Sequence, residues 1–190
     1  MQNVFYGTFC KLILRNILKK NKLFAAIFAF IISVLVLMFV PFLQVLVVKQ
    51  FNGSDKSKKY FSHYAAKNGF VINYRHSVNK GLVSDFYRTG KNGSLFLYET
   101  HFVNYGAGIS EPDEIPGAEF KVLSSGVYAL TSLNRELDQL VMAVGVVANH
   151  SIEIAEQEFF LTEYFESQTR LLIFVKRVSL FAYLFSSSRF

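Results

Sequence analysis

A histidine and a serine stand side by side at His76 and Ser77, and an acid, Asp85, follows within the same predicted hairpin. These are the residue types of a nucleophilic hydrolase. Neighbouring residues of a β-strand point to opposite faces, however, so His76 and Ser77 cannot form a nucleophile and base pair. The sequence also contains no G-x-S-x-G nucleophile motif. We therefore expect a protein that is not an enzyme and has no catalytic residues.

Metal binding by histidine would have to use His63, His76, His101 and His150. None of them shows ligand spacing such as H-E-x-x-H, so we expect no metal and no other cofactor. We expect instead that His76 is partly buried with its hydrogen bonds satisfied, since its predicted strand neighbours are apolar.

The turn formed by Tyr105, Gly106, Ala107 and Gly108 offers a different chemistry. Backbone N–H groups with little side-chain cover can cradle a carboxylate or a phosphate. The same glycines serve equally in a tight turn with positive φ, which we favour. The acids at 111, 113 and 114 lack the alternating spacing of a calcium loop and include a proline between them, so we expect a solvated loop there.

Asp85 is predicted to lie in a β-hairpin. Residues 70–78 and 82–87 are rich in β-branched and aromatic side chains, and the turn 79–81 between them ends in glycine. With Gly81 in the left-handed conformation, Arg75 lies opposite Asp85. This register predicts a cross-strand ion pair between them, worth at most ~1 kcal/mol if exposed.

The same register places His76 opposite Ser84 and separates the side chains into two faces. One face is predicted to carry Ile72, Tyr74, His76, Val78, Leu82 and Phe86, and the other Asn73, Arg75, Ser77 and Asp85.

Further strand-like runs follow the hairpin at even spacing. They cover residues 95–104, 119–123, 127–133, 139–148, 151–154 and 171–177, with a short helical turn expected within 161–167. Many short strands separated by turn signals predict an all-β domain, an antiparallel β-sandwich or barrel.

The longest apolar run, residues 23–48, precedes these strands and contains only Ser33 and Gln44 as polar side chains. As a helix it would be ~39 Å long, more than the ~30 Å of a bilayer core. A buried helix of a soluble protein usually has a polar edge, which this run lacks, so we predict a transmembrane helix. It exceeds the length of a cleavable signal peptide, which indicates an uncleaved signal anchor, and Pro41 should kink it.

The segment before the anchor is basic. Residues 3–22 show apolar spacing over three turns and favour an interfacial amphipathic helix, with a disordered leader as the alternative. Residues 1–22 contain five Lys or Arg and no acid, which predicts a cytoplasmic N-terminus and a periplasmic C-terminal domain. The expected organisation is a leader at 1–22, the anchor at 23–48, a linker at 49–60, the β domain at 61–178 and an apolar tail at 179–190, docked on the surface or disordered.

The net charge of +6 and the pI of 9.4 do not indicate nucleic-acid binding, because many of the bases flank the anchor. Basic residues that flank a membrane helix usually bind lipid headgroups and determine the orientation of the helix. Cys10 is the only cysteine and precedes the anchor, so the β domain forms no internal disulfide.

Four stretches resemble, in order, a family known only as a domain of unknown function: INYRHSVNKGLVSDFY, ETHFVNYGAG, LVMAVGVVANHSIEI and RLLIFVKR. The resemblance covers about residues 69–177. Its most specific pieces are His76 and Ser77 with Asp85, the turn at 105–108, and Asn149 with His150. The chain departs from the family in lacking a proline at Leu82 or Val83 and in its long apolar tail.

Members of that family occur beside TAXI-type tripartite ATP-independent periplasmic (TRAP) transporters, which carry organic acids. The resemblance implies a non-catalytic accessory subunit of such a transporter in the bacterial inner membrane. Its expected partners are the permease, the periplasmic solute-binding protein and the lipid bilayer. The turns at 105–108 and 149–150 would face the partner or the solute path.

Small residues let membrane helices approach closely, so the stripe Ala25, Ala29 and Ile32 would pack on the permease. A stand-alone periplasmic ligand-binding module or enzyme stays open as the alternative.

Overall fold

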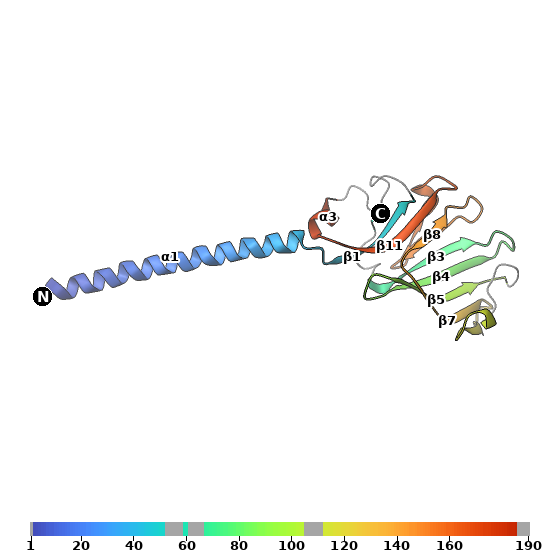
Figure 1. Ribbon diagram of the computed structural model, residues 1–190, viewed down its shortest axis with the longest axis horizontal. Coiled ribbons are helices and arrows are strands. Elements are labelled where there is room, and N and C mark those ends of the chain that lie inside the picture. The colour runs from blue at the N-terminus through green and yellow to red at the C-terminus, as the bar shows by residue number, and fades with distance from the viewer. Residues whose placement is uncertain (1, 52–58, 61–66, 105–111, 186–190) are drawn as a thin grey trace.

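The computed structural model describes residues 2–51, 59–60, 67–104 and 112–185, and it shows a long helix projecting from a β domain (Figure 1). The helix, α1 (Gln2–Phe39), includes a segment, Asn21–Phe39, that is long and apolar enough to cross a membrane. None of that segment is buried within the protein, so the alternative of a soluble core helix is wrong. Because α1 is continuous from Gln2, the alternative of a disordered leader is wrong as well.

The β domain contains two antiparallel sheets. The first has the strand order β2-β1-β11-β8 and the second has the order β10-β9-β3-β4-β5-β7-β6. The elements are β1 (Leu43–Gln50), β2 (Lys59–Tyr60), β3 (Phe70–Arg75), β4 (Leu82–Thr89), β5 (Leu95–Phe102), η2 (Pro112–Glu114), β6 (Glu119–Val122), β7 (Tyr128–Leu137), β8 (Leu140–Ala143), β9 (Ser151–Ile154), β10 (Gln157–Phe160), η3 (Leu161–Glu163), β11 (Arg170–Val178) and α3 (Leu180–Leu184).

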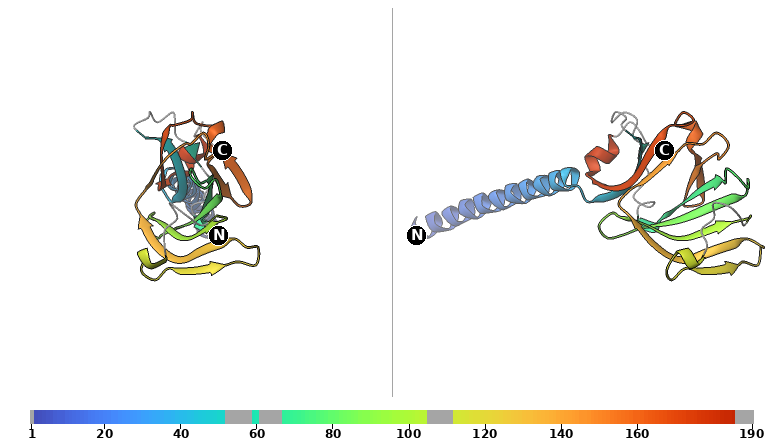
Figure 2. Two further views of the ribbon diagram at one scale, coloured as in Figure 1. Left: turned by 90° about the vertical axis from the view of Figure 1, so that its right-hand side faces the viewer. Right: turned by 45° about the vertical axis from the view of Figure 1, so that its right-hand side comes forward.

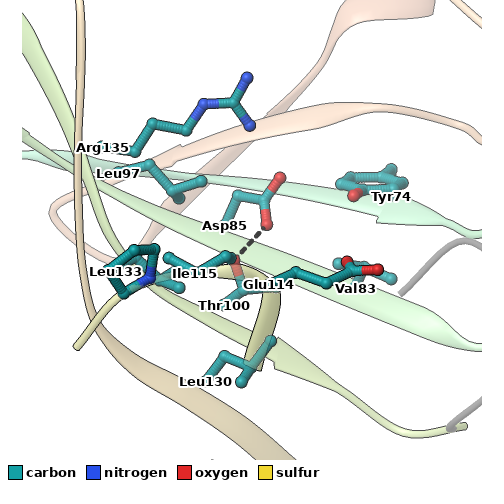
Figure 3. A pocket seen from close by; sticks show the side chains of 11 residues that line it. Tyr74, Val83, Asp85, Leu97, Thr100, Glu114, Ile115, Leu130, Leu133 and Arg135 are labelled. Atoms are coloured by element: carbon teal, nitrogen blue, oxygen red, sulfur yellow. Dashed lines mark hydrogen bonds between the residues drawn. The ribbon is translucent and has the colours of Figure 1, made fainter. Parts of the chain in front are cut away.

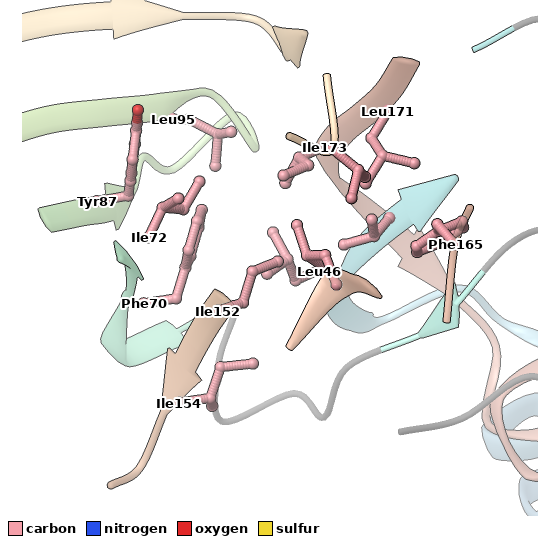
Figure 4. Close-up of a cluster of buried hydrophobic side chains, with 13 residues drawn as sticks. Leu46, Phe70, Ile72, Tyr87, Leu95, Ile152, Ile154, Phe165, Leu171 and Ile173 are labelled. Atoms are coloured by element: carbon pink, nitrogen blue, oxygen red, sulfur yellow. The ribbon is translucent and has the colours of Figure 1, made fainter. Parts of the chain in front are cut away.

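The two sheets form two layers (Figure 2), and the main hydrophobic core lies between them (Figure 4). The first sheet contributes Leu46 of β1 and Ile173 of β11, and the second contributes Phe70, Tyr87 and Ile152, among others. Phe70 and Tyr87 are cross-strand partners whose rings stack 5.1 Å apart. The predicted all-β class with an N-terminal helix is therefore confirmed, and the domain is a sandwich.

The predicted anchor boundary at Val48 is wrong. The helix ends at Phe39, just before Pro41, and the chain continues as strand β1. Pro41 thus follows the end of the helix instead of kinking it, because proline disfavours helical backbone in the residue before it. The β domain starts at Leu43 rather than at residue 61.

The central residues of strand β1 are all apolar, like those of a membrane helix, because both faces of the strand are buried. Leu46 and Val48 face the main core, whereas Val45 and Val47 join Val178 in a smaller cluster on the other side of the sheet. All four β1 side chains are fully buried. A strand covered on both faces has no polar alternation to distinguish it from a buried helix.

The predicted hairpin is present, but its register is wrong. Arg75 pairs with Leu82, three residues from the expected partner, and Asp85 pairs with Ile72. The predicted ion pair between Arg75 and Asp85 is therefore absent, and His76 does not pair with Ser84. Side chains alternate between the two faces of a strand, so a register shift by an odd number of residues places each residue on the opposite face from the one predicted. Asp85 consequently shares the inner face with Ile72 rather than the outer face.

The cause lies in the connection between β3 and β4, which spans residues 76–81 instead of 79–81. Lys80, with φ of 58°, takes the left-handed conformation that was expected at Gly81. The Asn79 side-chain oxygen accepts a hydrogen bond from the Gly81 N–H at 2.9 Å, and the His76 N–H donates to the Gly81 carbonyl at 2.8 Å. This side-chain capping stabilises a longer loop than turn statistics predict.

The other predicted strands correspond to β5, β6, β7, β9 and β11, and η3 is the expected helical turn. The run 139–148 is a strand only over β8, and β10 was not predicted. The expected linker includes the end of β1 and the short strand β2, with residues 52–58 outside the described part of the chain. In the tail, α3 docks on the first sheet through Tyr183.

Replacing Leu46 by Ala tests whether β1 is a core strand. We expect a loss of roughly 2–5 kcal/mol in the free energy of unfolding, since Leu46 has no solvent exposure. The measurement is urea unfolding of the full chain in detergent, followed by tyrosine fluorescence. Leu82→Ala, at a position that is 47% exposed, is the control and should change it by less than about 0.5 kcal/mol. Equal effects of the two substitutions would contradict the assignment of β1 to the core.

Candidate functional site: a cavity around Asp85

The second sheet carries a cavity of about 570 Å³ on its inner face. Residues of β3, β4, β5 and β7 form its wall, and residues 114–116 close one side (Figure 3). The lining side chains are Tyr74, Val83, Asp85, Leu97, Thr100, Glu114, Ile115, Pro116, Leu130, Leu133 and Arg135. This volume falls in the range of small-molecule sites, ~300–1,000 Å³.

The sheet register brings the polar groups of the cavity together. Asp85 of β4 lies opposite Ile72 of β3 and opposite Thr100 of β5, which in turn lies opposite Leu130 of β7. Residues paired across strands share a face, so this row presents one acid and one hydroxyl between two apolar side chains. The Thr100 hydroxyl donates a hydrogen bond to an Asp85 carboxylate oxygen at 2.9 Å.

The environment of Asp85 opposes its ionisation. Burial raises the pKa of Asp85 from its ordinary 3.8 to about 6, although hydrogen bonds from Thr100 and Tyr74 and the charge of Arg135 partly counteract this. Desolvation disfavours the charged form of a carboxyl group, so the raised pKa reflects the apolar surroundings. A carboxylate kept in such a place at a cost in stability is a candidate functional group.

Two tyrosines beside Asp85 stay protonated at neutral pH. Burial and the neighbouring Asp85 raise the pKa of both Tyr74 and Tyr87. The ring of Tyr74 stacks on the His150 ring with centroids 5.4 Å apart. Burial lowers the pKa of His150, and its Nδ1 accepts a hydrogen bond from the Gly145 N–H at 3.2 Å. His150 therefore supports Tyr74 from outside the cavity as a neutral ring.

Irregularities in two strands shape the opposite wall. Thr131 of β7 pairs with Glu99 and Arg135 pairs with Leu97, so residues 132–134 of β7 oppose only residue 98 of β5. Ser132 and Asn134 in this bulge have φ values of 61° and 49°. Leu133 between them is buried and lines the cavity. Bulges redirect side chains, and left-handed non-glycine residues often mark functional sites.

Most of the predicted site residues lie elsewhere. His76 is in the hairpin loop, where its Nδ1 faces the N–H groups of Val78 and Asn79 at 3.3 and 3.4 Å, and Ser77 is exposed. His76 is half-buried as expected, but not on a strand. The turn at Tyr105, Gly106, Ala107 and Gly108 lies outside the described residues.

Of the sequence-predicted residues, the structure brings together Asp85, in the cavity wall, and His150, behind Tyr74. Asn149 is exposed in a turn with φ of 44°. Sequence reasoning missed Tyr74, Thr100, Leu133 and Arg135, because the correct register and the β7 bulge are needed to place them. The one available signal was the place of Asp85 between Val83 and Tyr87, at the alternate positions that share one face of a strand. Among the residues that the structure describes, no group of three His, Cys, Asp or Glu side chains is placed to hold a metal.

Residues 70–161 match a family model described as "Domain of unknown function (DUF1850)". The resemblance to a family of this description is thereby confirmed for the segment from β3 to the start of η3, which contains the whole cavity wall. The comparison with curated proteins yields no match. No solved structure matches either.

Asp85→Asn should stabilise the protein at neutral pH. The folded state raises the pKa of Asp85 because it accommodates the protonated carboxyl group better than the charged one. The protonated group costs no stability below the ordinary pKa of 3.8, and ionising it in the folded protein lowers the free energy of unfolding as pH rises through about 6. We expect the variant to be more stable than the natural protein by about 2–3 kcal/mol near pH 7.5, with little difference near pH 4. Urea unfolding at the two pH values measures this difference.

The matched control is Asp138→Asn, at an exposed position outside the cavity. Because this side chain is exposed, the substitution should change the free energy of unfolding by less than about 0.5 kcal/mol. If Asp85→Asn destabilised the protein equally at both pH values, the carboxylate would be a structural group whose ionisation is not opposed by the fold.

Proposed function

We propose that this protein is a non-catalytic, membrane-anchored accessory subunit of a TAXI-type TRAP transporter for organic acids. The observation that supports it most directly is the apolar segment Asn21–Phe39, which has no buried residue, joined to a folded domain with a DUF1850 match. Such a helix, inserted in a membrane, would hold the domain next to a partner embedded in the same membrane. The tie to the transporter comes from the family resemblance.

In this proposal the protein crosses the bacterial inner membrane once, with its N-terminus cytoplasmic and the β domain periplasmic. The basic leader supports that orientation, because positively charged segments are retained on the cytoplasmic side. Strand β1 begins only three residues after the helix ends, so the domain stands close to the membrane surface.

The helix face proposed to contact the permease is Ala25, Ala29 and Ile32. All three residues are exposed, and their spacing places them on one side of α1. Apolar helices gain little from the hydrophobic effect within lipid, so a specific contact depends on close packing at small side chains.

A stand-alone periplasmic ligand-binding module is the second candidate, and the Asp85 cavity favours it. The two candidates differ in what remains bound after gentle solubilisation. A C-terminally tagged chain expressed from its own locus, purified in mild detergent and analysed by mass spectrometry, should recover the TRAP membrane subunit. Recovery of no transporter subunit would overturn the first candidate in favour of the second.

Replacing Ala25 and Ala29 by Leu tests the helix contact while keeping the segment apolar. We expect recovery of the permease to fall on the order of tenfold, the equivalent of a helix contact worth ~1–2 kcal/mol. Ile27→Leu with Val34→Leu, on the opposite face of α1, is the matched control and should leave recovery unchanged. If recovery survives both the alanine replacements and an exchange of the whole segment for an unrelated anchor, the helix is only a tether and the β domain binds the partner.

A further inference from the structure

The cavity around Asp85 combines apolar side chains with one partly buried acid. Val83, Leu97, Leu130 and Leu133 supply apolar walls from three strands, and Ile115 covers one side. These side chains suit the apolar body of a small molecule, since binding there removes its surface from water.

The polar part of the wall combines the carboxylates of Asp85 and Glu114 with the Thr100 and Tyr74 hydroxyls and the Arg135 guanidinium. An ionised carboxylate accepts hydrogen bonds at about four lone-pair positions and donates none. In Asp85 the hydroxyls of Thr100 and Tyr74 occupy part of that capacity. The remaining acceptor positions of the Asp85 carboxylate would be filled by a ligand that carries hydrogen-bond donors at its charged end.

The charges that face Asp85 favour a cation over an anion. Tyr74 and Tyr87 are protonated, and His150 behind Tyr74 is neutral. Glu114 and Arg135 line the cavity with exposed side chains of opposite charge, and the charge of Arg135 only partly offsets the effect of burial on the pKa of Asp85. An anionic ligand pairing with Arg135 would lie beside two carboxylates, whereas a cation would find a desolvated counter-ion in Asp85.

We propose that this cavity binds a small organic cation, a protonated amine attached to an apolar body, with the Asp85 carboxylate as its counter-ion. The bulge in β7 is part of the site, because it directs Leu133 toward the body of the ligand. This site does not depend on association with a transporter, and it holds no organic acid at neutral pH.

Binding of the cation should follow the ionisation of Asp85. Only the ionised form pairs with an ammonium group, so the apparent affinity scales with the ionised fraction. With a pKa of about 6 for Asp85, that fraction drops about tenfold between pH 7 and pH 5.

The test compares three probes that share one body: cyclohexylamine, cyclohexanol and cyclohexanecarboxylate. The full chain in lipid nanodiscs is titrated by calorimetry with each probe near pH 7, and with the amine over a pH series. We expect binding of the amine that is at least tenfold tighter than that of the alcohol or the carboxylate. Asp85→Asn should weaken it by at least tenfold, and the control Asp138→Asn should not.

The proposal is overturned if the alcohol or the carboxylate binds as well as the amine, if no amine binding is detected, or if Asp85→Asn binds the amine unchanged. Circular dichroism checks that the variant is folded. The pH series on the natural protein needs no variant, and an affinity that is constant from pH 7 to pH 5 would also contradict the role of Asp85. None of these results bears on recovery of a permease.

A separate observation concerns α3 at the other end of the domain. Ser179 caps this short helix by accepting a hydrogen bond from the Ala182 N–H at 3.1 Å, and Tyr183 packs on the small cluster behind β1. The remaining apolar side chains point outward, with Phe181, Leu184 and Phe185 exposed by 41%, 47% and 70%.

These side chains lie where the apolar helix ends. The rings of Phe39 and Phe181 stack with centroids 5.3 Å apart, and Phe181 contacts Phe185 at 4.6 Å. The 19 residues Asn21–Phe39 are ~28 Å long as a helix, close to the ~30 Å of a bilayer core. When α1 spans a membrane, α3 is therefore level with the headgroups, and the exposed Arg177 lies two residues before Ser179, where a positive charge would favour anionic lipid.

We infer that α3 enters the headgroup layer of the same bilayer and holds the first sheet against the membrane, which rests on the proposed spanning role of α1. The chain contains no tryptophan, so single-tryptophan variants report one site each. In liposomes, Phe185→Trp should show blue-shifted emission and quenching by brominated lipids, whereas Val122→Trp on β6 should show neither. Val36→Trp, within α1, reports insertion of the helix itself. Quenching of Val36→Trp without quenching of Phe185→Trp would overturn this inference and leave the anchor intact.

Discussion

The burial of β1 on both of its faces is the constraint on which the rest of the structure depends. The chain passes from an exposed apolar helix into the middle of the first sheet within three residues, and four consecutive side chains, Val45 to Val48, become fully buried. Pairing with β11 along its whole length joins the two ends of the domain. Leu46 and Val48 then organise the main core, and Val45 and Val47 provide the surface on which α3 docks.

That same constraint explains which parts of the fold could be predicted from sequence. Strands β3 and β4 of the second sheet bury mainly one face and are bounded by turns, so their positions were largely predicted correctly. Strand β1 could not be separated from the helix before it by hydrophobicity, because both are continuous apolar runs. Pro41 is the local signal that divides them. A proline within the last third of a long apolar run is better interpreted as the end of a helix when β-branched residues follow it.

The site was less predictable than the fold, for a related reason. Asp85 was identified as a candidate residue, but its expected surroundings depended on a register that the capped loop between His76 and Gly81 shifts by three residues. The shift exchanges a solvent-exposed pairing with Arg75 for a place opposite Ile72 on the inner face. Tyr74, Thr100 and Arg135 come from three further strands, and no local pattern links them before the sheet is assembled.

The two sheets separate the part of the protein that contacts α1 from the part that forms the cavity. The first sheet lies next to α1 and α3, while β5 and β7 lie on the other side of the domain (Figure 1). Both of these strands contribute residues to the cavity. Tyr87 of β4 belongs to the main core and interacts electrostatically with Asp85, so it connects the core to the cavity. Close-packed interiors transmit small displacements but resist large ones. Under the two proposals, this core would keep the ligand site at a fixed distance from the bilayer, a role that fits either an accessory subunit or a tethered binding module.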